Sequence, residues 1–383
     1  MTERIYLDHN ATAPLLPEAR AAVLEALAAA GNPSSIHAEG RGARDRIEAA
    51  RGEVARLCGG AADEIILTSG GTEADSLGVV GLALGARRAG RPARVLATAI
   101  EHPAVTGAVA TLVGLGFTAE DVRVDGDGRI DLDDLRARCG DGVALVTVAA
   151  ANHELGTLQD VAAVAAIARA AGAAVHVDAV QLAGKQPLAP VCAVADAVAL
   201  SAHKLGGPAG AGALWSRRGV ELTPAGGSTG HQERGRRPGT ENLVGIVGLG
   251  AAAAVATASP ARWAAATAAA AQLEAGLRDL GARIHGAGAP RVGNTVNAAF
   301  DGVRGHDVVI ALDLAGVACA TGAACSSGSV QPSPVLLALG LAPARAREAI
   351  RFSTGPATKA AEIARVLALL PPILARARGG GRR

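Results

Sequence analysis

The strongest constraint on the fold of this chain is the alternation of short apolar runs with longer helical stretches through its middle. The apolar runs have the length of strands, and the stretches between them have the length and pattern of helices. Because this alternation favours parallel strands covered by helices, we predict an α/β fold with a mostly parallel seven-stranded sheet between helices. The expected strands span residues 64–68, 93–99, 121–124, 143–149, 173–178, 195–200 and 211–216.

The two ends of the chain predict a second, smaller unit. An alanine-rich stretch after Thr240 predicts one long helix that runs to about Gly281, and a strand at 295–299 and a closing helix at 360–376 follow it. We therefore expect a large domain over residues 15–255 and a small α+β domain made of residues 1–14 and 256–383. The helices expected in the large domain are 18–30, 43–57, 72–88, 104–115, 132–138 and 161–171.

Composition excludes several classes of protein. A net charge of +2 gives no ground for a nucleic-acid partner. No apolar stretch approaches 20 residues and the first residues lack a signal-peptide pattern, so we expect a cytoplasmic protein with no membrane partner. The five cysteines have no Cys-x-x-Cys spacing, which argues against a disulfide framework and a structural zinc site.

Two of the expected strands lead into residues that together indicate a cofactor. Asp178 ends the strand 173–178, and Lys204 follows the strand 195–200 within Ser201-Ala202-His203-Lys204. A lysine amine can hold an aldehyde cofactor as a Schiff base, and a buried carboxylate can keep a pyridine nitrogen protonated. Because open α/β sheets bind ligands at the carboxyl ends of their strands, we predict a pyridoxal 5'-phosphate site at this edge.

A phosphate site is predicted where a strand, a glycine turn and a helix start follow one another. In Thr68-Ser69-Gly70-Gly71-Thr72-Glu73, glycines such as Gly71 allow close approach of an anion, and the helix start offers free N–H groups. Thr72 can add a hydroxyl group. A plain connection is the alternative for this segment alone, which lacks the spacing of a Walker loop or a dinucleotide fingerprint. Further candidate phosphate donors are Ser201, His203 and Thr240.

His102 and Gln181 are candidates for contacts with the cofactor ring. His102 follows the strand 93–99 and precedes Pro103, which suits a first helical position. Its ring could stack on a planar cofactor, or it could cap its own helix. Gln181 lies three residues beyond Asp178 and could donate to the phenolic oxygen of the cofactor.

A second reactive group is predicted near the C-terminus. Cys325 lies in the loop Thr321-Gly322-Ala323-Ala324-Cys325-Ser326-Ser327-Gly328, where no bulky neighbour would bury it. An exposed, mobile thiolate can act as a nucleophile; a chance surface cysteine is the alternative. Arg351 could bind a substrate carboxylate in bidentate fashion, with a structural ion pair as the alternative.

Together these motifs resemble those of the cysteine desulfurases, which are fold-type-I pyridoxal-phosphate enzymes of the class V aminotransferase family. The resemblance runs from Tyr6-Leu7-Asp8-His9-Asn10-Ala11-Thr12 to Arg351-Phe352-Ser353. The short loop around Cys325 resembles the subgroup that supplies sulfur for iron–sulfur cluster assembly, because the Arg-x-Gly-His segment of the other subgroup is absent before it. Intermediate matches include Gly31-Asn32-Pro33-Ser34-Ser35-Ile36-His37, Glu101-His102-Pro103-Ala104-Val105 and Arg237-Pro238-Gly239-Thr240.

The resemblance implies a homodimeric enzyme that converts L-cysteine to L-alanine and leaves the sulfur as a persulfide on Cys325. The sulfur would pass to an iron–sulfur scaffold or another acceptor protein, and Cys325 is a candidate transient iron–sulfur ligand. His153 stands where the family usually has a cofactor-contacting asparagine. The remaining implied roles are the cofactor linkage for Lys204, the pyridinium for Asp178, the phenolic oxygen for Gln181, stacking for His102, the phosphate for Thr72, Ser201 and His203 with Thr240 of the other subunit, and the substrate carboxylate for Arg351 and Asn32.

Other functions fit the same pattern. A selenocysteine lyase or a cysteine-sulfinate desulfinase would share the scaffold but depend less on a loop thiol. An ordinary aminotransferase has no use for a mobile cysteine. A catalytically silent docking module is the alternative from outside enzymes, although the presence of Lys204, Asp178 and Cys325 argues against it.

Overall fold

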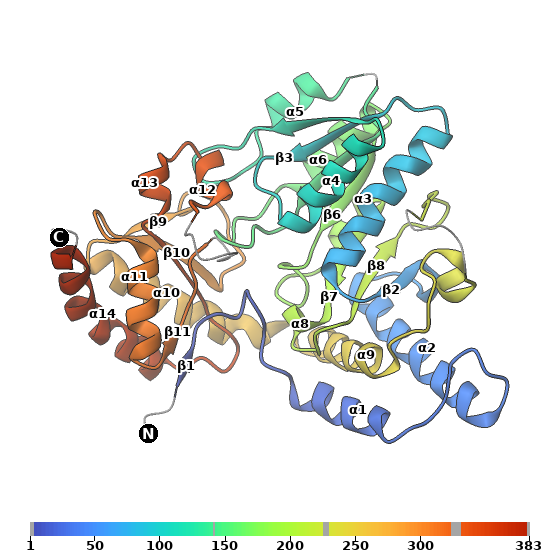
Figure 1. The fold of residues 1–383 in the computed structure, drawn as a ribbon, viewed down its shortest axis with the longest axis horizontal. Coiled ribbons are helices and arrows are strands. Elements are labelled where there is room, and N and C mark those ends of the chain that lie inside the picture. Colours follow the sequence, from blue (N-terminus) through green and yellow to red (C-terminus); the bar gives the residue numbers. More distant parts are fainter. Residues whose placement is uncertain (1–3, 141, 225–229, 323–330, 381–383) are drawn as a thin grey trace.

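The computed structural model describes residues 4–140, 142–224, 230–322 and 331–380, and the structural statements below concern those residues. Its largest element is a seven-stranded sheet in the order β2-β8-β7-β6-β5-β3-β4 (Figure 1). Only β8 runs against its neighbours in this sheet, so the sheet is mostly parallel as predicted. The strands are β2 Ile65–Thr68, β3 Arg94–Thr98, β4 Thr118–Val122, β5 Leu145–Ala149, β6 Ala174–Asp178, β7 Ala197–Ser201 and β8 Gly212–Ser216.

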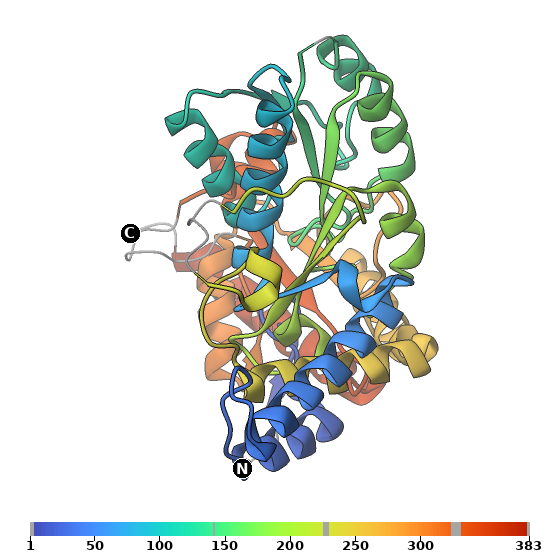
Figure 2. The same cartoon turned by 90° about the vertical axis from the view of Figure 1, so that its right-hand side faces the viewer.

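Helices cover both faces of this sheet, because its central strands are apolar on both sides. In β7, Val198 and Leu200 pack into one buried cluster, whereas Ala197 and Ala199 pack into the other. Helices α3 and α4 cover one face and α6 lies on the other, as Figure 2 shows with the sheet near edge-on. The helices of this part of the chain are α1 Pro17–Leu27, α2 Ala38–Cys58, α3 Gly71–Arg88, α4 Pro103–Gly114, α5 Leu132–Arg138, α6 Val161–Ala170, α7 Ala189–Val194, α8 Ala202–Leu205 and α9 Leu243–Ala258.

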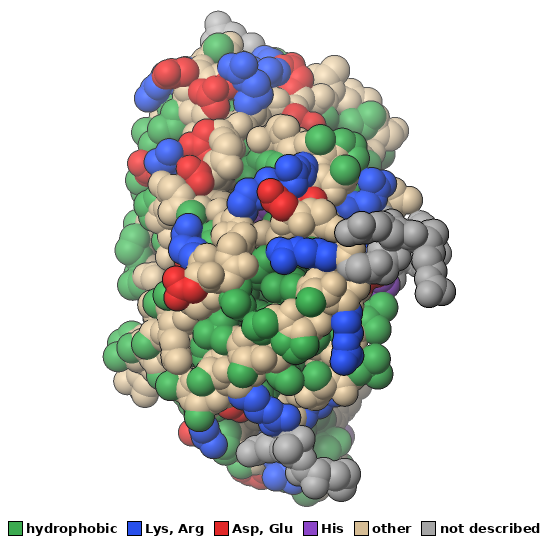
Figure 3. Space-filling view, turned by 90° about the vertical axis from the view of Figure 1, so that its left-hand side faces the viewer, with side chains coloured by type: hydrophobic (Ala, Val, Ile, Leu, Met, Phe, Trp, Pro, Cys, Tyr) green, Lys and Arg blue, Asp and Glu red, His purple; other side chains and the backbone are tan. Residues whose placement is uncertain are grey.

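A separate hydrophobic cluster joins the two ends of the chain. Leu7 packs there with Phe300 and Phe352, around a three-stranded antiparallel sheet in the order β12-β10-β9. The outer surface on this side of the molecule carries apolar side chains edged by Lys and Arg (Figure 3). The elements are β1 Ile5–Tyr6, α10 Ala264–Asp279, β9 Arg283–His285, β10 Thr295–Ala299, α11 Gly305–Leu314, β11 Val317–Ala318, α12 Pro334–Ala338, α13 Pro343–Ala346, β12 Ala349–Ser353 and α14 Ala360–Gly380.

The prediction of one long helix after Thr240 is wrong. The chain forms α9 and α10 instead, with a bend of 89° between Leu243–Ala258 and Pro260–Asp279. Pro260 explains the break, since its ring removes a backbone donor and clashes with the preceding helical turn. The predicted domain boundary at residue 255 falls in the last turn of α9 and stays a prediction.

Within the described residues, no single helix is long and apolar enough to cross a membrane. The bent pair of α9 and α10 passes that test only when its two helices are counted together, by length and composition.

Candidate active site

The register of the parallel strands brings the predicted cofactor residues to one edge of the sheet. Ala149 at the end of β5 pairs with Asp178 at the end of β6, and Asp178 pairs with Ala199 in β7. Two residues later β7 ends at Ser201, and the chain turns directly into the short helix α8 that carries Lys204. Asp178, Ser201 and Lys204 therefore share one edge, as the sequence predicted.

The Lys204 side chain crosses from α8 to the N-terminal segment. Its Nζ donates to the backbone oxygens of Asn10 at 2.5 Å and Ala11 at 2.8 Å. Burial, followed by repulsion from the Arg351 guanidinium, lowers the pKa of Lys204 to about 8. An amine with that pKa is partly neutral near physiological pH, which is the form that attacks a carbonyl group.

Asp178 is a buried carboxylate with little compensation for its charge. Its Oδ1 accepts one hydrogen bond, from the Val180 N–H at 2.8 Å, and its exposed fraction is 7%. Burial raises the pKa of Asp178 to about 6. A cationic ring nitrogen beside this carboxylate would relieve that cost, so Asp178 fits the predicted partner of a pyridinium.

Two further acids lie buried in the same region. Burial, with repulsion from Asp178, raises the pKa of Glu101 to about 8, although Glu101 Oε1 accepts bonds from the Thr98 hydroxyl and the Ala149 N–H. Burial likewise raises the pKa of Asp75, again with repulsion from Asp178. Glu101 is therefore mostly protonated near neutral pH, whereas Asp178 is mostly ionised there.

The start of α3 and the end of β7 form the predicted phosphate end of the site. A Cβ atom at Gly71 would come within 2.9 Å of Val180 and 3.2 Å of Ser201, so only glycine fits beside that strand end. The Ser201 hydroxyl is buried without a hydrogen-bond partner among the described residues. No side chain caps the start of α3 at Gly70, so its first N–H groups are available to an anion. Thr72 is exposed in the first turn of the same helix.

His102 caps its own helix, which is one of the two roles that the sequence offered, and its stacking on a cofactor stays a prediction. Its Nδ1 accepts the Ala104 N–H at 3.1 Å and thereby caps α4. Its ring meets that of His153 edge to face, with centroids 5.2 Å apart. The nearby Asn152 is committed to its own loop, since its Oδ1 accepts the Glu154 and Leu155 N–H groups, so the ring at this position comes from His153.

Both imidazoles are neutral. Burial is the main cause that lowers the pKa of His102 and, further, that of His153, and the Lys204 charge adds to both effects. His203, in α8 beside Lys204, contacts the Thr12 hydroxyl at 3.1 Å through Nδ1, and burial lowers its pKa to about 4. Each ring can therefore donate one N–H and accept one hydrogen bond.

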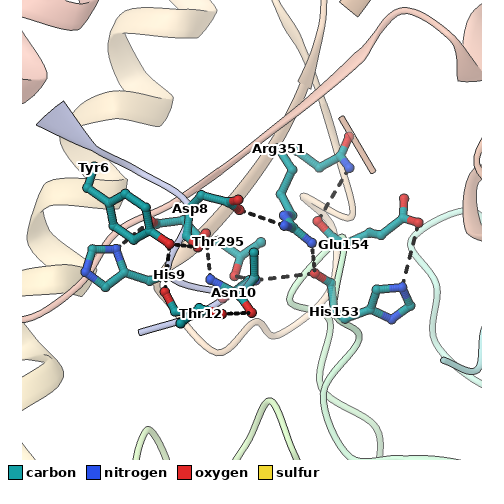
Figure 4. A network of polar contacts seen from close by, with 12 residues as sticks. Tyr6, Asp8, His9, Asn10, Thr12, His153, Glu154, Thr295 and Arg351 are labelled. Carbon is teal, nitrogen blue, oxygen red and sulfur yellow. Dashed lines mark hydrogen bonds and ion pairs between the residues drawn. The ribbon is translucent and has the colours of Figure 1, made fainter. Parts of the chain in front are cut away.

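Arg351 reaches this edge from β12. Its NH2 forms an ion pair with Asp8 at 2.8 Å and its NH1 donates to the His153 backbone oxygen at 3.1 Å (Figure 4). Its Nε is buried without a partner among the described residues. The structural ion pair that the sequence offered as an alternative is therefore present, and these two contacts leave further guanidinium N–H groups for a ligand.

Asn10 and Lys185 contact several of the predicted site residues, although no local sequence pattern marks them as part of the site. The Asn10 backbone oxygen accepts from Gln181 Nε2 at 2.9 Å as well as from Lys204. Its side-chain Nδ2 donates to Thr295 Oγ1, and its Oδ1 accepts from Lys185 Nζ at 3.1 Å. Asn10 thus ties β10 to the residues that follow β6, and only the tertiary structure reveals it.

Asn32 is not brought into this site within one chain. The loop between α1 and α2, which contains Asn32, lies at the lower right edge of Figure 1, away from α8. Asn32 Oδ1 accepts the Ser34 N–H in a local turn. Thr240 is exposed. Cys325 lies outside the described residues, and among the residues that are described no cluster of His, Cys, Asp or Glu could hold a metal ion.

The donor set fits pyridoxal phosphate. The test rests on the Ser201 hydroxyl and the uncapped start of α3, which lack a partner in the described structure, and on the buried Asp178 carboxylate with its raised pKa. Lys204 supplies the amine at the same edge. Ser201 and the start of α3 match a phosphate, Asp178 matches a protonated ring nitrogen, and Lys204 matches an aldehyde.

Comparisons with known proteins agree with this geometry. The class-V aminotransferase family matches residues 5–366. A cysteine desulfurase of Cereibacter sphaeroides is 44% identical over 97% of this chain and 96% of its own length. One of Gluconacetobacter diazotrophicus is 40% identical over 98% of this chain and 94% of its own length.

Solved structures give the same result. A NifS-like protein superposes with a TM-score of 0.89 and 32% identity over 97% of this chain and 99% of its own. A structure described as SspA in complex with cysteine has a TM-score of 0.79 and 28% identity over 92% and 99% of the two chains. The chain therefore belongs to the class-V aminotransferase family of pyridoxal-phosphate enzymes and, within it, to the cysteine desulfurases.

Proposed function

We propose that this enzyme takes the sulfur atom of L-cysteine, holds it as a persulfide on Cys325 and releases L-alanine. The observation that carries the proposal is that Lys204 and Asp178, from one sheet edge, meet Arg351, which comes from the separate three-stranded sheet. The names of the relatives and the complex of SspA with cysteine support cysteine as the substrate.

Each residue has a separate task in this proposal. Pyridoxal phosphate, when bound, supplies an electron-accepting ring that acidifies the substrate α-proton. Lys204, with a pKa of about 8, can take that proton and return it. Arg351 holds the substrate carboxylate, and Asp178 keeps a negative charge against the ring nitrogen. Gln181 and His102 would contact the ring, and Gly71, Thr72, Ser201 and His203 would hold the phosphate.

The transfer step balances without an outside oxidant. The Cβ–S bond of the substrate breaks and an S–S bond to Sγ of Cys325 forms. The carbon fragment takes up the proton that replaces sulfur and leaves as alanine. One carbon is reduced while the Cys325 sulfur is oxidised, so one cysteine and one enzyme thiol yield one alanine and one persulfide.

The location of the enzyme, its assembly and its sulfur acceptor are also part of the proposal. The enzyme acts in the cytoplasm as a homodimer, in which Thr240 and the Asn32 loop complete the site of the other subunit. Both are exposed in the single chain, which supports a role across an interface. The persulfide on Cys325 passes to an iron–sulfur scaffold or another acceptor protein, and Cys325 can serve as a transient iron–sulfur ligand there.

Replacement of the reactive thiol tests this function. Cys325→Ser should retain bound cofactor but lose persulfide formation and sulfide release from cysteine in the presence of a reductant. Cys319→Ser is the matched control, because burial raises the pKa of Cys319 to about 12 and makes it a poor nucleophile. Undiminished sulfur release by Cys325→Ser would indicate a selenocysteine lyase or a cysteine-sulfinate desulfinase instead.

A further inference from the structure

The chain has three lysines among its 37 basic residues, and two of them, the buried Lys185 and the half-buried Lys204, lie at the same site. Lys185 and Lys204 both donate to Asn10, the first to its side-chain oxygen and the second to its backbone oxygen. The third, Lys359, is exposed. Because arginine serves at every other basic position, a buried lysine at 185 suggests a compact ammonium group with a specific task.

The surroundings of Lys185 contain polar but uncharged acceptors. Its Nζ donates to Gln181 Oε1 at 2.9 Å and to Asn10 Oδ1 at 3.1 Å, and it lies 5.4 Å from the Trp263 ring centre. Its exposed fraction is 7%. Burial, with repulsion from Lys204 and Arg351, lowers the pKa of Lys185 to about 7. Burying an ammonium group among uncharged acceptors costs free energy, which indicates a role besides packing.

That role concerns the orientation of the Gln181 amide. When it is protonated, Lys185 only donates, so the atom of Gln181 that faces it is then the oxygen. The Asn10 backbone oxygen only accepts, so the atom that faces it must be the Gln181 nitrogen, at 2.9 Å. Both contacts select the same orientation of the amide, and one of the two Nε2 hydrogens remains free.

We propose that Lys185 is a positioning residue that fixes the Gln181 amide for the cofactor and places a positive charge next to the Lys204 nitrogen. This inference rests on the proposed function, since it assigns Gln181 to the phenolic oxygen of pyridoxal phosphate. The fixed amide presents one N–H to that oxygen. When it is protonated, Lys185 disfavours a proton on the nearby Lys204 nitrogen, which favours the reactive form of that nitrogen.

The test uses the holoenzyme and two readouts besides turnover. The first is the pH midpoint of the yellow absorption, which follows protonation of the Lys204 nitrogen. The second is the dissociation constant of pyridoxal phosphate from the apoenzyme. Lys185→Met should raise the midpoint by about half a pH unit or more and weaken cofactor binding about fivefold. Lys359→Met, which removes an equal charge at the surface, should change neither.

A double substitution separates the effect of Lys185 that depends on Gln181 from its direct effect on the Lys204 nitrogen. In a Gln181→Leu background, Lys185→Met should weaken cofactor binding less than it does in the wild type, because no amide is left to orient, whereas the shift of the midpoint should remain. Should Lys185→Met not fold, Lys185→Gln removes the charge but keeps a donor and should give the same upward shift. A midpoint unchanged in both variants would overturn the inference, whereas a wild-type protein without yellow absorption would overturn the proposed function instead.

Discussion

Arg351 and Asp8 form an ion pair of 2.8 Å in which the guanidinium still has a buried nitrogen, Nε, without a partner among the described residues. Asp8 therefore orients the group that we expect to bind the substrate carboxylate. The charge of Asp8 also limits the cost of keeping a cation in this buried place before substrate arrives.

Arg351→Lys should impair substrate binding more than cofactor binding. A lysine retains the charge but not the planar fork that binds a carboxylate, so we expect KM for cysteine to rise at least about tenfold. The yellow absorption should remain, since Arg351 makes no predicted contact with the cofactor. Steady-state kinetics and absorption spectra of the same preparation check both parts; an unchanged KM would remove Arg351 from the carboxylate site.

Lys204→Ala should abolish the yellow absorption that pyridoxal phosphate gives when it is linked to the enzyme. The amine of Lys204, with its pKa of about 8, is the expected point of linkage. Lys359→Ala provides the control, because Lys359 is exposed and should leave the spectrum unchanged. If the colour persists in Lys204→Ala and disappears in Lys185→Ala, the linkage belongs to Lys185.

The positions of Asp178 and Lys204 could be predicted because they follow from local pattern and one rule of topology. Apolar runs define strands, and parallel strands place their carboxyl ends at one edge. The contacts of Asn10 could not be predicted, because they join segments far apart in sequence, such as Asn10 and Thr295. The break at Pro260 was missed because the alanine-rich pattern continues on both sides of it, although proline lacks the backbone N–H that a helix interior uses.

Glu101→Gln should flatten the pH dependence of stability of the apoenzyme. The pKa of Glu101 rises from 4.5 in its ordinary range to about 8 in the folded protein. The folded state therefore holds a proton that the unfolded state has lost, so this contribution to stability is complete below pH 4.5 and disappears as the pH rises to about 8. A neutral glutamine has no such proton to lose.

The measurement is the free energy of unfolding by urea between pH 5 and pH 8 for both proteins. We expect the stability of Glu101→Gln relative to wild type to increase by about 3 kcal/mol across this range. Glu39→Gln, on the exposed start of α2, is the control and should follow the wild-type curve. Parallel curves for wild type and Glu101→Gln would mean that Glu101 is ionised throughout.

Arg51→Met should destabilise the protein strongly, because Arg51 and Glu233 form a buried bidentate ion pair. The two nitrogen–oxygen distances are 2.6 and 2.8 Å, and Glu233 also accepts the Leu67 N–H, which ties the segment before Thr240 to β2. Glu233 has a φ of 46°, an uncommon backbone conformation that these contacts hold in place. Removing the cation leaves the Glu233 carboxylate buried and unpaired, so we expect a loss of about 3 kcal/mol in urea unfolding. Arg56→Met, which breaks an exposed pair on the same helix, should cost less than about 1 kcal/mol, and equal losses in both variants would contradict this account.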